Sequence, residues 1–231
     1  MRLIKKLVGL AVLATIISNN PGILERWGNS VKEVLASQNL NSQASVIAPI
    51  TGEKSALVSY NSHGQAFLWR TCDPVKVLVN DGGDANNYQV IAKALNRAKE
   101  VTGVDFQIVS KTEETPVYDW YKRGGIPPVI IGVVDRTDLL GTANAVGTTV
   151  ANPAGPNIVT GAIALRKSYF ETHSLEKRYE VTLHEIGHLI GLQHSDNQSD
   201  LMYKSTTENV KTDFSDDEIN FFNKNKSCSK R

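Results

Sequence analysis

Cysteine, methionine and histidine are all scarce in this sequence of 231 residues, which has two, two and five of them respectively. Strong net charge is also missing, because 25 basic and 24 acidic side chains leave a formal charge of +1. A chain this close to neutrality lacks the basic surface that attracts phosphates, so we expect no nucleic-acid partner. Internal repeats and low-complexity segments are absent as well, which favours one ordinary globular domain with extensions.

The apolar run nearest the N-terminus is too short to cross a membrane comfortably. Residues 7–17 form this run, which follows a basic segment and precedes a polar break at residues 18–22. That order is typical of a secretory signal. No small-x-small cleavage site is obvious after Ile17, so residues 1–20 are interpreted as a signal peptide or an uncleaved signal anchor. We expect a secreted or extracellular protein, touching a membrane only if this segment stays attached at the cell surface.

The rest of the chain divides into an irregular N-terminal part and a regular main part. Residues 21–66 include an amphipathic helix pattern at 23–37 and are interpreted as an arm, a linker or a pro-segment. Residues 67–231 alternate strand and helix patterns, which indicates an α+β domain. Its expected elements are strands at 75–79, 106–109, 128–134 and 158–165, a helix at 86–101 and turns at 81–84 and 102–103. The continuous apolar run at 128–134 predicts a strand buried on both faces.

The two cysteines, Cys72 and Cys228, lie near opposite ends of the main domain. An even cysteine count in an exported protein predicts a disulfide. Closing a loop of about 155 residues would contribute about 4–5 kcal/mol in the chain-entropy model. Two free thiols are the alternative, and a third is that Cys72 binds a metal in a latent form of the protein.

A helix is expected before the histidine-rich segment. Ser174 is a suitable N-cap and Glu176 falls in the first turn, where an acidic side chain is favourable. The apolar positions that follow fit a helical face: Tyr179, Val181, Leu183 and Ile186.

Three of the five histidines fall within eleven residues, in the pattern His-Glu-x-x-His-x-x-Gly-x-x-His. On a helix, His184 and His188 lie one above the other and can bind one zinc ion. Glu185 lies beside that ion, where it can act as general base on zinc-bound water. Gly191 can end the helix and turn the chain so that His194 becomes the third ligand. Three protein ligands leave the fourth position open, as in a catalytic zinc site.

A different third ligand is also conceivable. In thermolysin-like enzymes this ligand is a glutamate well downstream of the helix, and Glu208 follows His188 by 20 residues. That scheme gives no role to Gly191 or His194, so the sequence favours His194.

The complete motif resembles that of the metzincin clan, and within it the matrixin-like secreted bacterial peptidases. Metzincins also have a methionine in a turn beneath the metal, and Met202 stands eight residues after His194. Residues 69–74 are similar to the start of that catalytic domain, and residues 214–219 to the entry of its last helix.

The resemblance implies a zincin-like α+β fold with a twisted five-stranded mixed sheet and three main helices. It implies a secreted zinc endopeptidase with one catalytic zinc ion, acting on protein or peptide substrates, and we expect a monomer. It also implies an edge strand that pairs with extended substrate. We assign this edge to residues 161–165, with Ala162, Ile163 and Ala164 next to the substrate, although an interior strand is the alternative. Tyr203 and the residues after it would line the pocket on the leaving-group side.

The sequence departs from related families in several ways. Tyr203 directly follows Met202, unlike in astacins, so tyrosine is not expected to bind the metal. Only His63 and His173 remain for the second, structural zinc of vertebrate matrixins, so we predict no such site. The Pro-Arg-Cys-Gly latency motif is absent too. Calcium could bind the acidic loops at 81–84 and 196–200, although solvated carboxylates are the simpler interpretation. The alternative function is a noncatalytic surface-binding protein, which would not need Glu185.

Overall fold

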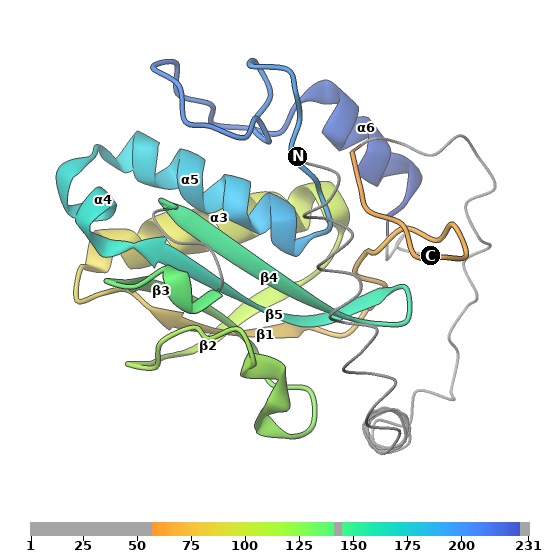
Figure 1. Ribbon diagram of the computed structural model, residues 1–231, viewed down its shortest axis with the longest axis horizontal. Coiled ribbons are helices and arrows are strands. Elements are labelled where there is room, and N and C mark those ends of the chain that lie inside the picture. The colour runs from red at the N-terminus through yellow and green to blue at the C-terminus, as the bar shows by residue number, and fades with distance from the viewer. Residues whose placement is uncertain (1–56, 141–144, 227–231) are drawn as a thin grey trace, which may run out of the picture. The chain divides into compact units, whose positions relative to one another are not determined.

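A computed structural model describes residues 57–140 and 145–226 (Figure 1). The predicted signal segment, the helix at 23–37 and Cys228 lie outside the described residues. The Cys72–Cys228 disulfide and the domain limit at residue 20 therefore stay predictions, and so does the limit at residue 66.

Five strands form one mixed sheet with the order β2-β1-β3-β5-β4. The strands β2, β1, β3 and β5 run parallel to one another, and β4 alone runs antiparallel, paired with β5. The strands are β1 (Val75–Asn80), β2 (Phe106–Lys111), β3 (Val129–Val134), β4 (Gly147–Ala154) and β5 (Asn157–Arg166). Every residue of β3 is buried, which confirms the prediction from its continuous apolar run.

Helices cover the sheet on the side that carries the main core, and α3 and α5 lie along it next to each other (Figure 1). Two short 3-10 helices contribute Trp120 and Leu140 to a smaller core, separate from the main one. The elements are α3 (Ala85–Thr102), η1 (Trp120–Arg123), η2 (Asp138–Leu140), α4 (Lys167–Thr172), α5 (Leu175–Leu189) and α6 (Asp216–Lys224). The predicted α+β fold with a five-stranded mixed sheet and three main helices is confirmed. Among the described residues, no helix combines the length and the apolar character needed to cross a membrane.

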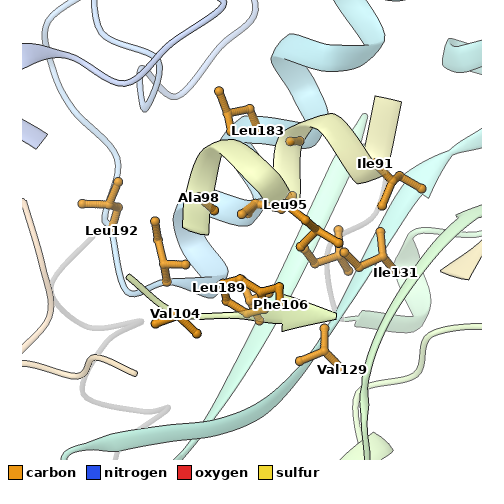
Figure 2. Packing of buried hydrophobic residues seen from close by; sticks show 14 of the residues in the cluster. Ile91, Leu95, Ala98, Val104, Phe106, Val129, Ile131, Leu183, Leu189 and Leu192 are labelled. Carbon is orange, nitrogen blue, oxygen red and sulfur yellow. The ribbon is translucent and has the colours of Figure 1, made fainter. Parts of the chain in front are cut away.

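The main core lies between the sheet and the two long helices (Figure 2). Ile91 and Leu95 from α3 meet Ile131 from β3, while Leu183 and Leu189 come from α5. All five side chains are at most 2% exposed. Burying each such side chain contributes about 1.5–3 kcal/mol, so this layer fixes α5 firmly on the sheet.

Polar contacts fix the start of α5 against the start of α3. The Asp84 carboxylate caps α3 by accepting from the Asn86 amide at 2.9 Å. Arg178 of α5 donates to the Asp84 and Asn87 side chains, both at 2.9 Å. Gly103 ends α3 with a φ of 79°, as the turn predicted after Thr102 requires.

The prediction that residues 161–165 form an edge strand is wrong. They belong to β5, which pairs with β3 on one side and with β4 on the other. Ala162, Ile163 and Ala164 are fully buried in consequence. The edge next to β5 is β4, which the sequence interpretation missed because its Gly, Pro and polar Thr residues give no strand pattern. Pro153 is compatible with β4 because an edge strand leaves half of its amides without a ladder partner.

Candidate active site

The helix α5 carries the first two histidines of the motif. Its N-cap is Ser174, whose hydroxyl accepts from the Lys177 amide, so the predicted helix start is confirmed. At the other end, the Trp69 indole donates to the Leu189 carbonyl at 2.8 Å. This bond satisfies one of the carbonyls that a helix leaves open at its C-terminus. The helix therefore ends directly after His188.

Gly191 turns the chain after α5. Its φ of 108° lies in a region that side chains rarely adopt, and a Cβ at this position would overlap the carbonyl oxygen of Phe67. After the turn, Leu192 pairs with Val58, and the Gln193 amide donates to the Leu57 carbonyl at 2.8 Å. Glycine is therefore required here for two reasons: the turn needs a positive φ, and the backbone of Phe67 comes too close to leave room for a Cβ.

The turn brings His194 to the two helical histidines. Ligand atoms of His184, His188 and His194 all lie within 4.8 Å of one another. The Nε2 atoms of His188 and His194 are 3.1 Å apart. His184 Nδ1 lies 2.8 Å from the Leu201 carbonyl, and His188 Nδ1 lies 2.9 Å from the Leu192 carbonyl. A carbonyl can only accept, so both Nδ1 atoms carry the proton and both Nε2 atoms keep a free lone pair.

This arrangement fits a zinc ion. At Zn–N bond lengths of 2.0–2.1 Å, tetrahedral geometry separates two ligand nitrogens by about 3.3 Å. The separation between His188 and His194 is close to this value. The backbone bonds to Nδ1 are the contacts that hold metal-binding imidazoles in position. Among residues 57–140 and 145–226, these three histidines are the one group of possible ligands brought together. Neither Cys72 nor the exposed Glu208 belongs to it.

Burial keeps the histidines of α5 in the neutral form. It lowers the pKa of His184 and of His188 to about 4 in each case, although the backbone bonds act in the opposite direction. Burial also lowers the pKa of the more exposed His194. The three side chains are therefore uncharged at neutral pH, which is the form that binds metal.

Met202 lies beneath the helix and is 1% exposed. A Cβ at Gly187 would overlap its sulfur atom, so the motif needs glycine here to admit the methionine. The turn around Met202 is fixed by its carbonyl, which accepts from the Ser195 amide at 2.8 Å. Since the preceding carbonyl, that of Leu201, accepts from His184, the turn also orients a candidate ligand.

Glu185 is 5% exposed and points toward β4. Its Oε2 atom accepts from the Thr149 hydroxyl at 2.6 Å. Burial raises the pKa of Glu185 to about 7, against the lowering effect of this hydrogen bond. A Cβ at Gly147 would lie 2.6 Å from Glu185 Cγ, so glycine is needed where β4 passes the carboxylate. Thr149 and Gly147 are site residues that the sequence interpretation missed, and no sequence signal connects them with Glu185.

The histidines and Glu185 line a cleft of about 720 Å³. Its walls are β4 on one side and the segment from Leu201 to Lys211 on the other, with α5 between them. Tyr203 lines the cleft, and its place on the leaving-group side of the substrate stays a prediction. Ala162, Ile163 and Ala164 do not, because they are buried inside the sheet.

In the acidic loops suggested for calcium, three carboxylates bind other groups of the protein. Asp81 pairs with Lys111 at 2.5 Å, and Asp84 caps α3. Asp200 accepts from the Ser195 hydroxyl and from the Asn197 amide group, at 2.7 and 3.0 Å. These contacts do not support a calcium site.

The region around the histidine motif matches a known protein family. The model of the family described as Matrixin, Peptidase_M10, matches residues 144–224. This range runs from the start of β4 through the histidine motif and the Met202 turn to the end of α6. None of the curated proteins matches the chain.

Proposed function

We propose that this protein is a zinc endopeptidase exported from the cell, and the match of residues 144–224 to the matrixin family model supports the peptidase part of the proposal. The observation that carries the proposal is the convergence of three neutral histidines beside a buried carboxylate in an open cleft. His184, His188 and His194 would hold the metal. When bound there, zinc polarises the scissile carbonyl and makes water more acidic.

Glu185 is the proposed general base. Its side chain lines the cleft together with the three histidines, and the Thr149 hydroxyl donates to one of its oxygens. It would take a proton from the attacking water and deliver it to the amine that leaves, so no other proton carrier is needed. A noncatalytic binding protein would have no use for a buried carboxylate at this place, since burying it has a cost.

The edge strand β4 is the proposed docking element for substrate. It forms a wall of the cleft, and its outer side has no partner strand in the described part of the chain. An extended peptide could add to this edge by backbone hydrogen bonds. Such binding would place the peptide across Glu185, which β4 contacts through Thr149.

The test is cleavage of an unfolded protein, such as reduced casein, by the purified zinc-loaded protein. We expect activity that a zinc chelator removes and added zinc restores, and none with Glu185→Ala. His194→Ala should lose both zinc and activity, while His63→Ala, which changes an exposed histidine outside the cluster, should lose neither. Undiminished cleavage by Glu185→Ala would refute the proposed mechanism.

Export is tested separately, by locating the protein in cells and medium. The apolar segment at residues 7–17 supports this part of the proposal. We expect the protein in the medium or at the outer cell surface, and a cytoplasmic location would contradict it. A monomer is also expected, and sedimentation would check this.

A further inference from the structure

The cleft also carries charged side chains that the proposed catalysis does not use. Glu180 from α5 and Lys211 both line it, with only 5% and 11% of their side chains exposed. Charged side chains are rarely buried to this degree unless they are paired or functional. Tyr203, Ser205 and Thr206 complete a polar pocket around them.

The hydrogen bonds of Glu180 are already satisfied. Its Oε1 accepts from the Lys211 backbone amide at 3.1 Å, and its Oε2 accepts from Lys177 Nζ at 3.0 Å. The Lys211 ammonium lies 3.9 Å from Glu180 Oε1, beyond hydrogen-bond distance. The carboxylate is therefore bound mainly by groups other than the Lys211 ammonium.

Lys211 keeps donors for another partner. Its Nζ atom donates to the Thr207 hydroxyl at 3.0 Å and lies 5.7 Å from the centroid of the Tyr203 ring. An ammonium group has three donors, so the bond to Thr207 leaves two of them for a ligand in the cleft that Lys211 lines. Lys177 and Lys211 both lie near Glu180, so these three side chains together carry one net positive charge.

We propose that this pocket selects an acidic side chain of the substrate next to the scissile bond, and that Lys211 determines the preference. The inference rests on the proposed peptidase function. A glutamate or aspartate carboxylate would accept from the free donors of Lys211 and balance its charge. An uncharged glutamine could accept the same bonds without balancing the charge, and a lysine would be repelled. His184 and Glu185 line the same cleft, and Glu180 lies one helical turn before His184 on α5, so the residue that the pocket holds lies close to the reacting bond.

The experiment uses four fluorogenic peptides that differ only in the residue directly after the cleaved bond, which is Glu, Gln, Leu or Lys. We expect wild-type protein to prefer Glu over Gln about tenfold in kcat/KM, which corresponds to about 1.4 kcal/mol. Lys211→Met keeps the aliphatic stem and should bring this ratio close to one. Lys211→Glu should prefer the lysine peptide. Lys76→Met removes an exposed charge outside the cleft and should keep the wild-type ratio.

A binding measurement separates this inference from the proposed function. Zinc-loaded Glu185→Ala should bind the glutamate peptide about tenfold more tightly than the glutamine peptide, and the added Lys211→Met change should remove the difference. Equal binding, or an unchanged ratio with Lys211→Met, would overturn the role of Lys211 even if the protein cleaves casein. Absence of any cleavage would instead refute the peptidase function, while the binding ratio would still decide the role of Lys211.

Discussion

The most direct test of how the third histidine is positioned is Gly191→Ala. The new Cβ would overlap the carbonyl oxygen of Phe67 and lie 3.2 Å from Leu68 Cδ2. The backbone at this position also has a φ of 108°, which an alanine rarely adopts. The substitution therefore combines two costs, one from the backbone angle and one from the overlap with another backbone segment.

Gly83→Ala is a matched control because it has the unfavourable backbone angle without the overlap. Gly83 has a φ of 86° and nothing lies within 4 Å of its added Cβ. The unfavourable angle alone costs about 1–2 kcal/mol. Overlap in a packed region adds about 1–3 kcal/mol. We expect Gly191→Ala to lose about 2–5 kcal/mol of unfolding free energy, and Gly83→Ala only about 1–2 kcal/mol.

Urea unfolding of the zinc-free proteins measures both losses without the contribution of the metal. For a chain of this size, each kcal/mol also lowers Tm by about 2–4 °C. Zinc titration then measures the effect on the site. The Leu192 carbonyl, which accepts from His188, comes directly after Gly191 in the chain, so a changed turn would also move this histidine. We expect zinc affinity to fall about 10–100-fold with Gly191→Ala and to stay unchanged with Gly83→Ala. Equal stability of the two variants would refute the argument that the contact with Phe67 requires glycine.

Three further substitutions and metal removal test the remaining contacts. Thr149→Val removes the hydroxyl bound to Glu185, and it should lower kcat about tenfold or more with zinc content unchanged, whereas Thr149→Ser should restore most activity. Gly147→Ala should displace the Glu185 side chain and lower kcat without loss of zinc, so wild-type kinetics would contradict the close approach of β4. Gly187→Ala should destabilise the protein by about 1 kcal/mol in urea unfolding, because overlap with Met202 outweighs the gain in helix propensity. Chelation should lower Tm, since free zinc at 100 times its Kd stabilises the folded state by about 2.7 kcal/mol, and an unchanged Tm would argue against a metal site.

The parts of the site that could be predicted from sequence are those with local signals. Ser174, the apolar periodicity and the histidine spacing together predict α5, and Gly191 predicts the turn that follows it. These features act within one helix and its cap, so their geometry follows from helix geometry alone. The structure brings His194 to the other histidines as that reasoning expects.

The parts that could not be predicted depend on contacts between distant segments. The bond from Thr149 to Glu185 spans 36 residues, and the one from Lys211 to Glu180 spans 31. Neither pair shares a periodic pattern. The strand β4 was missed for a related reason, because an edge strand beside a cleft can be polar on both faces and carries proline where no ladder bond is needed. The wrong assignment of the edge to β5 followed from that omission.

The position of β4 has a consequence for how the site is assembled. The strand that would bind extended substrate is the same strand that holds Glu185, through the Thr149 hydroxyl and the close approach at Gly147. The candidate metal ligands, in contrast, are oriented by α5 and by the loop from Gly191 to Met202. Because β4 pairs directly with β5, and α5 packs against both strands, the substrate edge and the metal ligands share one rigid support. A peptide added to β4 would therefore meet the carboxylate and the histidines in a fixed geometry, which is what catalysis by positioning requires.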